Sequence, residues 1–355
     1  MITKSAEKYS FETGVYRPPS EGGSDSLLVR VTRNCPWNRC TFCGMYKQKD
    51  YSLRSPQEVN DDIDSMAAIC KGLKDVSWEL DYGGEMNREV AFAMINKDPE
   101  LDAGPGFLMI YHWLLAGGKT CFLQDADSLK MNSDQFLNII THLRKTFPSL
   151  NRVTTYARSR TIAQKSAEEL KKIRLAGLDR LHVGLETGDK VLLKKIKKGV
   201  TAQGHIEAGK KAMEAGFQLS EYWMPGLGGK DMWESHARNT ARVLNEINPD
   251  YIRSRPFYPA PGTPLCQEYD RGEFQPLSPS EQLIELKLMM EELDFTCRVC
   301  FDHAGNYWRG KSGRLLFSQS YEGYQFPEQK PVVLSLLEEG IEAQAGVPRP
   351  PMLNL

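Results

Sequence analysis

Short apolar runs alternate along the chain with longer segments in which apolar residues recur every three or four positions. Runs of the first kind are typical of buried strands, and segments of the second kind are typical of helices that cover a sheet. The pattern predicts strands at 27–33, 119–123, 152–156, 181–185, 218–223 and 251–255. It predicts helices at 56–72, 134–146, 167–177, 189–198, 202–215, 233–246, 279–293 and 331–340.

Three of the predicted helices begin with a local signature. Ser55, Ser166 and Ser278 are each followed three residues later by glutamate, which is the pattern of a capping box. Strands that alternate with helices are joined by crossovers, so they form a parallel sheet. We therefore expect an α/β fold, a partial (β/α)6 barrel of the TIM type. Functional groups should lie at the carboxyl ends of its strands.

Two parts of the chain depart from this alternation. Residues 74–117 lie between the first helix and the second strand, and they predict a helical insertion. Residues 295–355 form a C-terminal extension that ends in a proline-rich stretch. We expect an N-terminal segment over 1–26, a barrel over 27–294 that includes the insertion, and then the extension.

Composition narrows the class of protein. The chain has 355 residues, of which 41% are hydrophobic and 26% charged, as is ordinary for a soluble globular protein. The net charge of −1 shows no general basic surplus, so we expect no nucleic-acid partner. No apolar run could span a bilayer, and the first residues lack the apolar core of a signal peptide. Eight cysteines, three of them clustered, fit reducing conditions, so we expect a cytoplasmic protein.

Three cysteines carry the most specific chemical signal. Cys35, Cys40 and Cys43 lie in one short segment that follows the first predicted strand. Three thiolates can hold three irons of a [4Fe–4S] cube and leave the fourth iron open to a small molecule. A structural zinc site is the alternative. Zinc needs a fourth Cys or His close by, however, and the nearest candidate, Cys70, falls on a predicted helix.

This segment resembles the cluster motif of the radical S-adenosylmethionine (SAM) superfamily. Cys40 and Cys43, with Phe42 directly before the third cysteine, match the family pattern, although four residues rather than three separate Cys35 from Cys40. The run Gly184–Gly188 is similar to a motif shared by tRNA methylthiotransferases and oxygen-independent coproporphyrinogen oxidases. The resemblance implies a [4Fe–4S] cluster on the three cysteines, with SAM as the second cofactor beside Phe42.

The resemblance also implies that SAM is cleaved reductively. An external donor such as flavodoxin or ferredoxin would supply the electron, and a 5′-deoxyadenosyl radical would then abstract hydrogen from the substrate. The tail lacks the RNA-binding domain that methylthiotransferases carry after the barrel, so we expect a small-molecule or peptide substrate. The alternatives are an RNA-modifying radical SAM enzyme and a non-catalytic iron–sulfur protein for electron transfer or redox sensing. No residue is singled out as catalytic.

Residues at the ends of predicted strands are the candidates for binding SAM. Gln124 or Asp125, after the second strand, is expected to take its amino group. Glu85, in a Gly-Gly-Glu run within the insertion, is the alternative. Arg158 or Arg160, after the third strand, would hold the SAM carboxylate or an acidic group of the substrate through paired hydrogen bonds.

The later strands complete the expected site. Glu186 is expected to accept hydrogen bonds from the ribose hydroxyls or the amino group of SAM. Gly226, in a glycine-rich run, would let the backbone approach adenine. Arg253 and Arg255 share one face of the sixth strand, so one of them would touch substrate. The lysines within 194–198 are expected to form a solvated helix end.

A second group of cysteines lies near the C-terminal end. Cys297 and Cys300 could hold an auxiliary iron–sulfur cluster or a metal, with Cys266 as a third ligand and His303 nearby. The alternative is that residues 297–301 form a strand that closes the barrel. The cysteines would then be structural.

Overall fold

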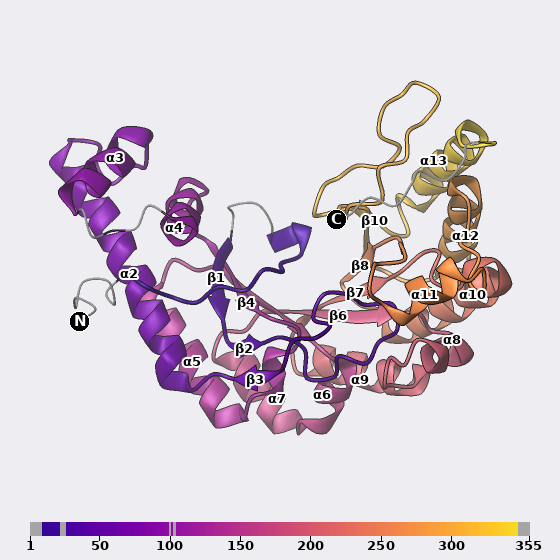
Figure 1. The fold of residues 1–355 in the computed structure, drawn as a ribbon, viewed down its shortest axis with the longest axis horizontal. Coiled ribbons are helices and arrows are strands. Elements are labelled where there is room, and N and C mark those ends of the chain that lie inside the picture. The colour runs from indigo at the N-terminus through magenta and orange to yellow at the C-terminus, as the bar shows by residue number, and fades with distance from the viewer. Residues whose placement is uncertain (1–8, 22–25, 99–100, 102–103, 347–355) are drawn as a thin grey trace. The chain divides into compact units, whose positions relative to one another are not determined.

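The computed structural model describes residues 9–21, 26–98, 101 and 104–346, and its elements follow the predicted alternation (Figure 1). The strands are β1 (Ser26–Arg30), β2 (Thr32–Arg33), β3 (Ser52–Leu53), β4 (Thr120–Gln124), β5 (Arg152–Ala157), β6 (Arg180–Glu186), β7 (Gln218–Trp223), β8 (Tyr251–Ser254), β9 (Arg298–Cys300) and β10 (Tyr324–Gln325). The α-helices are α2 (Pro56–Glu79), α3 (Arg88–Lys97), α4 (Pro105–Leu115), α5 (Ser133–Thr146), α6 (Ser159–Gln164), α7 (Ala167–Leu175), α8 (Lys190–Lys195), α9 (Ala202–Glu214), α10 (Gly229–Ile247), α11 (Pro264–Asp270), α12 (Pro279–Glu292) and α13 (Lys330–Ala343). Two short 3-10 helices are η1 (Pro19–Glu21) and η2 (Ser128–Lys130).

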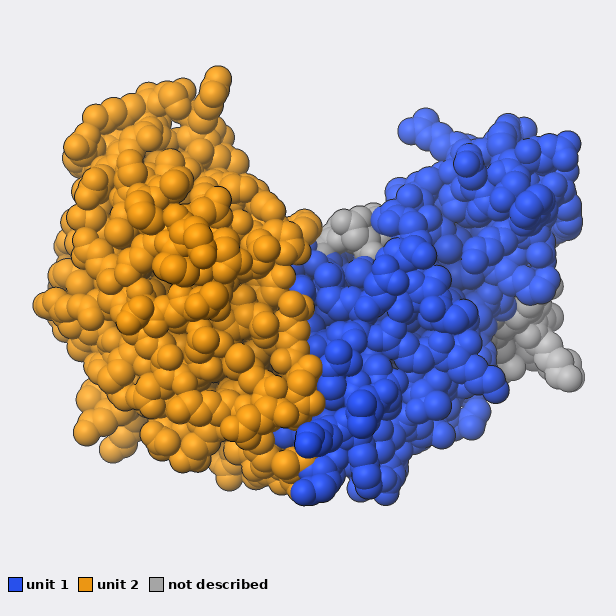
Figure 2. Space-filling model, turned by 180° about the vertical axis from the view of Figure 1, so that it is seen from behind, with its two compact units in different colours: residues 1–34, 51–156, 168–180 blue, residues 35–50, 157–167, 181–355 orange. Residues whose placement is uncertain are grey.

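The chain divides into two compact units (Figure 2). Unit 1 comprises residues 1–34, 51–156 and 168–180, and unit 2 comprises residues 35–50, 157–167 and 181–355. The expected borders of the barrel segment stay a prediction. The described part of the C-terminal extension belongs to unit 2, together with strands β7 and β8.

Unit 1 is built on three parallel strands in the order β1-β4-β5. Leu28 lies opposite Phe122, which lies opposite Thr154, and all three are buried. The long helix α2 packs against β1 and α5, and Figure 1 shows α2 and α5 side by side. The predicted capping box begins α2, since the side chain of Ser55 accepts the N–H of Glu58.

Unit 2 contains its strands in the order β6-β7-β8-β9-β10. Strands β7, β8 and β9 are parallel, and β10 is antiparallel to β9. Helix α9 packs on α6 and α10, and α12 packs on α10 and α13 (Figure 1). Strand β9 pairs with β8 through Ile252 and Val299, as the strand interpretation of 297–301 predicts.

The structure extends or divides several predicted elements. The helix predicted at 56–72 continues to Glu79, so the helical insertion begins inside α2 and contains α3 and α4. The strand predicted at 27–33 is two strands, of which β2 pairs with β3 in a separate antiparallel ladder. Helices α6 and α11, of 6 and 7 residues, were not predicted because so few residues show little periodicity.

The observed elements confirm the predicted α/β class, in which parallel strands alternate with helices along the chain. Among the residues that the structure describes, no helix has both the length and the apolar character needed to cross a membrane.

Candidate functional site

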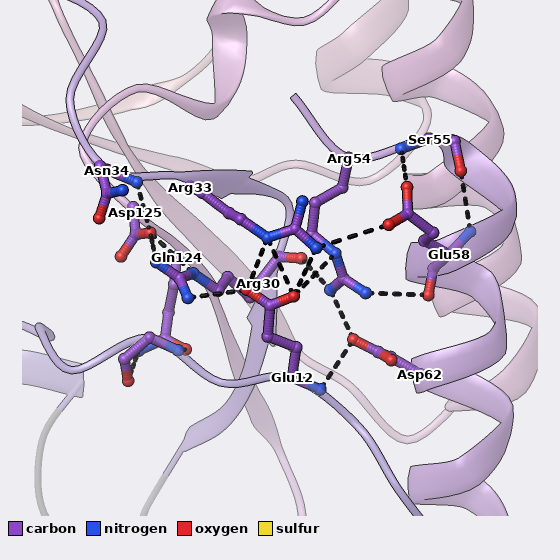
Figure 3. Close-up of polar contacts among 11 residues, drawn as sticks. Glu12, Arg30, Arg33, Asn34, Arg54, Ser55, Glu58, Asp62, Gln124 and Asp125 are labelled. Carbon is purple, nitrogen blue, oxygen red and sulfur yellow. Dashed lines mark hydrogen bonds and ion pairs between the residues drawn. The ribbon is translucent and has the colours of Figure 1, made fainter. Parts of the chain in front are cut away.

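The loop that carries the three cysteines is closed at its base within unit 1. Strands β2 and β3, one on each side of the loop, pair with each other. The Oδ2 atom of Asp125 accepts the backbone N–H of Asn34 and the Nε–H of Arg30, both at 2.9 Å (Figure 3). Because Asp125 is only 1% exposed, a buried carboxylate holds the residue that directly precedes the first cysteine.

Ion pairs extend this anchor through unit 1 (Figure 3). The carboxylate of Glu12 accepts hydrogen bonds from Arg30 at 2.8 Å and from Arg33 at 2.6 Å. It also lies 3.6 Å from Nε of Arg54, which in turn donates to Asp62 at 2.5 Å. The hydrogen bond from Arg33 lowers the pKa of Glu12, so this carboxylate stays ionised at neutral pH. The network thereby fixes the chain that enters the cysteine loop.

The two side chains expected to bind the amino group of SAM make contacts within unit 1. Gln124 accepts the N–H of Gly14 at 2.8 Å and donates to the carbonyl oxygens of Gly14 and Tyr16 at 3.0 and 3.2 Å. A Cβ on Gly14 would lie 2.6 Å from Oδ1 of Asp125, so glycine allows this close approach. Gln124 and Asp125 lie at the end of β4, and their binding of SAM stays a prediction. Glu85 is exposed between α2 and α3, away from any strand end.

In unit 2 the three cysteines have free thiols and are partly buried. Asn38 adopts the left-handed conformation, with φ of 43°, and its N–H donates to Sγ of Cys35 at 3.4 Å. The N–H of Cys43 donates to the carbonyl of Cys40 at 3.4 Å. The long first spacing of the motif is therefore taken up by a turn around Asn38.

Phe42 anchors the loop in an apolar cluster of unit 2. Its ring is among the buried side chains of the cluster, and Cys40 and Cys43 pack against the same group. The other buried members are Leu192, Ile196, Met224, Leu227, Phe257, Leu265 and Phe274. Backbone hydrogen bonds of 3.0 Å join Thr41 to the end of α8 and to the start of α11. Phe42 thus positions two of the cysteines, and its contact with SAM stays a prediction.

Trp37 ties the loop to the segment that follows α8. Its indole N–H donates to the carbonyl of Lys197 at 2.7 Å. A Cβ on Gly199 would lie 2.4 Å from the ring, so this contact requires glycine. The guanidinium carbons of Arg39 and Arg158 lie 5.2 and 5.1 Å from the ring centroid. Cation–π contacts of this kind contribute about 0.5–1 kcal/mol at exposed sites, and here they hold Arg158 beside the loop.

The carboxylate at the end of β6 has both backbone strain and an unsatisfied oxygen. Glu186 has a φ of 64°, a region that non-glycine residues seldom occupy. Its Oε1 accepts a hydrogen bond from Nζ of Lys198 at 2.9 Å. Within the described part of the chain, its buried Oε2 has no hydrogen-bond partner. A Cβ on Gly184 would lie 2.2 Å from Oε1, so glycine leaves room for this carboxylate. Such features are typical of binding sites.

Burial and nearby charges act in opposite directions on the thiols. Burial raises the pKa of Cys40 to about 11, against the opposing effect of Lys198. Burial also raises the pKa of Cys43, which Arg255 opposes. Iron binds the thiolate, so assembly of a cluster must release these protons. Cations at Lys198, Arg158 and Arg255 favour the thiolates, and the donor set therefore fits a cluster held by three of them.

A cluster fits this loop better than a single metal ion does. Across residues 9–21, 26–98, 101 and 104–346, no three His, Cys, Asp or Glu side chains gather around a point where one ion could bind. In a cube, each cysteine binds a different iron, so the ligands lie further apart than those of one ion. Cys70, the alternative zinc ligand, is buried on α2 of unit 1.

The arginines predicted to bind anionic groups have different surroundings. Arg160 is exposed on α6. Arg253 is fully buried and donates three hydrogen bonds, one of them to Asp302 at 2.9 Å. These contacts give Arg253 a structural role, so Arg255 is the one of the two that stays predicted to touch substrate. Arg255 is partly buried, and among the described residues its side chain has no hydrogen bond or ion pair.

Gly226, the residue expected near adenine, is held against α12. Its φ is 85°, and its N–H donates to Oε2 of Glu285 at 2.5 Å. A Cβ at this position would lie 2.7 Å from Nε2 of Gln282. Burial raises the pKa of Glu285 to about 8, so this carboxyl is mostly protonated at neutral pH. The approach of Gly226 to adenine stays a prediction.

The C-terminal cysteines lie in packed surroundings in unit 2. Cys297 and Cys300 are 2% and 0% exposed, and Cys300 belongs to β9. The thiol of Cys300 donates to the carbonyl of Tyr321 at 3.4 Å. Cys266 lies on α11, with its sulfur 4.0 Å from Asp270. These contacts fit the strand interpretation, and an auxiliary cluster stays a prediction.

Three functional candidates were missed from the sequence. Lys198 was expected to be solvated with its neighbours, but its side chain is only 12% exposed beside Glu186. Glu221 on β7 and His205 on α9 are fully buried, and each has an unpartnered polar atom among the described residues. Burial raises the pKa of Glu221 and lowers that of His205. A lone carboxylate inside the predicted strand 218–223 was the available signal for Glu221.

Comparisons with known sequences identify the family of the chain. A family model described as the radical SAM superfamily matches residues 29–238, which is more than half of the chain. The tRNA uridine(34) acetyltransferases of Methanocaldococcus jannaschii and Methanocaldococcus infernus are 27% and 25% identical over 121 and 120 residues. These segments cover 34% and 33% of this chain and 22% of each relative, so the match spans about a fifth of those proteins.

Similar solved structures include methylornithine synthase, at 16% identity and a TM-score of 0.45, covering 91% of this chain and 73% of that one. Coproporphyrinogen III oxidase from Escherichia coli has 14% identity and a TM-score of 0.46, covering 77% of this chain and 54% of the other. The family match confirms the resemblance and the cofactors that it implies. The chain belongs to the radical SAM superfamily of enzymes, which use a [4Fe–4S] cluster and S-adenosylmethionine.

Proposed function

We propose that this enzyme cleaves SAM reductively and modifies a small-molecule or peptide substrate. Cys35, Cys40 and Cys43 would hold the cluster. When bound, the cluster passes an electron to SAM, whose carbon–sulfur bond breaks to give a radical that abstracts hydrogen from the substrate. The observation that carries this proposal is the pairing of three free thiols in one loop with the unpartnered oxygen of Glu186.

The residues around the loop have separate tasks in this proposal. Lys198 holds one oxygen of Glu186, and the other oxygen accepts hydrogen bonds from the amino group or ribose of SAM. Arg158 and Arg255 supply positive charge for the carboxylate of SAM and for an acidic group of the substrate. The apolar cluster around Phe42 excludes water behind the cysteines, which protects a reactive radical from solvent.

The test is an anaerobic reaction of the enzyme reconstituted with iron and sulfide. Dithionite and SAM are added, and the nucleoside products are separated. We expect 5′-deoxyadenosine, and a deuterated substrate would then transfer its label into that product. Methylthioadenosine would mean that a different carbon–sulfur bond breaks. An intact cluster that fails to bind or cleave SAM would overturn the proposal in favour of electron transfer alone.

RNA modification is the second candidate function. Two observations favour it: the sequence match to tRNA acetyltransferases, and the exposed basic residues Arg39, Lys194 and Lys197 near the cysteine loop. An RNA substrate predicts tRNA binding that weakens steeply with salt, since binding to phosphates releases counterions. Charge reversal at Lys194 and Lys197 would then reduce tRNA binding and leave SAM cleavage without substrate unchanged.

A further inference from the structure

A largely buried cation lies beside the segment that carries Cys40 and Cys43. The ammonium of Lys198 is 2.9 Å from Oε1 of Glu186 and 6.0 Å from the ring centroid of Phe42. Phe42 lies in the sequence between Cys40 and Cys43. The N–H of Thr41, next to Cys40, donates at 3.0 Å to the carbonyl of Ile196, two residues before Lys198. An exposed lysine would have little effect here, because water and salt screen its charge.

The backbone on both sides of Lys198 fixes the position of this charge. Its N–H donates to the carbonyl of Leu193 at 3.1 Å, and its own carbonyl accepts Nη2 of Arg158 at 3.0 Å. The preceding residue, Lys197, has a φ of 52° and holds the indole of Trp37 through its carbonyl. The same segment therefore holds Lys198 inward and braces the cysteine loop.

The ion pair with Glu186 keeps Lys198 charged. Although burial disfavours the charged amine, the carboxylate of Glu186 raises the pKa of Lys198. Lys198 is therefore an ammonium at neutral pH, and its positive charge lies beside the ring of Phe42 in the cysteine loop.

We propose that Lys198 makes the cluster easier to reduce by holding a largely buried positive charge beside the segment that carries Cys40 and Cys43. This inference rests on the proposed function. In the step concerned, one electron passes from an external reductant to the cluster, the reductant loses that electron, and no bond or proton is transferred. The cluster and its three thiolates become more negative by one charge, and a nearby cation stabilises that state. Net charge and surroundings are known to set cluster potentials.

The test is a redox titration of the reconstituted enzyme without SAM, with the reduced cluster followed by electron paramagnetic resonance. In Lys198→Met we expect reduction to be at least tenfold less favourable, a shift of about 59 mV to lower potential for one electron. Lys197→Met is the matched control, because it removes an exposed charge and leaves the backbone contact with Trp37. Its potential should stay near that of the wild type. Lys198→Arg keeps the positive charge, so its potential should stay close to that of the wild type.

A second set of variants covers the case in which Lys198→Met folds poorly. Glu186→Gln removes the opposing negative charge, so it should shift the potential upward. The double variant Lys198→Met/Glu186→Gln leaves no unpaired buried charge, and its potential should lie below that of Glu186→Gln alone. Iron content per chain checks that each variant holds a complete cluster.

The outcomes separate this inference from the proposed function. If the wild type assembles no cluster or does not cleave SAM, the proposed function fails. If the wild type does both, and the potentials of Lys198→Met and Lys197→Met are equal, only the role of Lys198 is wrong. Equal potentials for Glu186→Gln and the double variant would likewise show that Lys198 does not affect the potential of the cluster.

Discussion

Two carboxylates at strand ends, one in each unit, have opposite surroundings. Asp125 in unit 1 accepts hydrogen bonds from a backbone N–H and from Arg30, and it is almost completely buried. Glu186 in unit 2 has a left-handed backbone and, among the described residues, an oxygen without a partner. Position at a strand end is common to both. From its satisfied hydrogen bonds we propose that Asp125 is a support, and from its strained backbone and unsatisfied oxygen we propose that Glu186 is a binding group.

The largest expected effect concerns the three cysteines of the loop in unit 2. Replacing Cys35, Cys40 or Cys43 by alanine should abolish the cluster and SAM cleavage, since each thiolate binds its own iron. Iron content and the absorbance of the reconstituted protein measure this loss. The control Cys297→Ala/Cys300→Ala should keep about four irons per chain. If all three alanine variants kept their iron, the central proposal would be wrong.

The support role of Asp125 predicts a large loss of stability. In Asp125→Ala, the free energy of unfolding should fall by about 3 kcal/mol, because Arg30 and the N–H of Asn34 lose a buried partner. Urea unfolding of the cluster-free protein measures this change. The exposed carboxylate of Asp134 gives a matched control, and its alanine variant should lose less than about 1 kcal/mol.

The same variant can also show that the support role proposed for Asp125 is wrong. If Asp125→Ala were as stable as the wild type but bound SAM weakly, Asp125 would be a ligand-binding residue, as its sequence position predicts.

The binding role of Glu186 predicts a loss of affinity rather than of fold. Glu186→Gln should weaken SAM binding about tenfold, or about 1.4 kcal/mol, because a charged acceptor becomes a neutral amide. Calorimetric titration of the reconstituted enzyme under anaerobic conditions measures this. Glu268→Gln, at a partly exposed ion pair of the same unit, is the control and should bind SAM normally. Unchanged affinity in Glu186→Gln would remove Glu186 from the SAM site.

Glu285 provides a further comparison, because its Oε1 atom also has no hydrogen-bond partner among the described residues. Its pKa is raised to about 8 by burial, so the folded state binds a proton that the unfolded state releases above about pH 4.5. Stability should therefore fall as pH rises, by about 1.4 kcal/mol between pH 6 and pH 7, and level off above pH 8. Glu285→Gln should flatten this slope. Urea unfolding at several pH values measures it.

The result for Glu285 shows whether an unsatisfied oxygen alone identifies a binding carboxylate. If Glu285→Gln keeps the pH dependence of stability, another titratable group causes that dependence. If Glu285→Gln instead loses SAM affinity, as Glu186→Gln should, then Glu285 is also a binding carboxylate. An unsatisfied oxygen would then identify a binding carboxylate without backbone strain.

Much of the architecture was predictable because it depends on local pattern. The strands at 152–156, 181–185 and 218–223 agree with the observed elements to within one residue at each end, since strands leave short segments that contain β-branched, aromatic and other apolar residues. The capping boxes at Ser55 and Ser278 are present because they need only residues three apart. Pairings between distant segments, such as β2 with β3, leave no such local signal.

The sequence by itself determined the superfamily, the α/β alternation and the three cysteines, because spacing and periodicity are properties of neighbouring residues. Only the tertiary structure decided which charged groups are paired. Arg253 and Arg255 look alike in the sequence, as do Lys197 and Lys198, yet one of each pair is buried and hydrogen-bonded. Burial and electrostatic partners come from residues far apart in the chain. They distinguish the hydrogen-bonded carboxylate of Asp125 from that of Glu186, which we propose as a binding group.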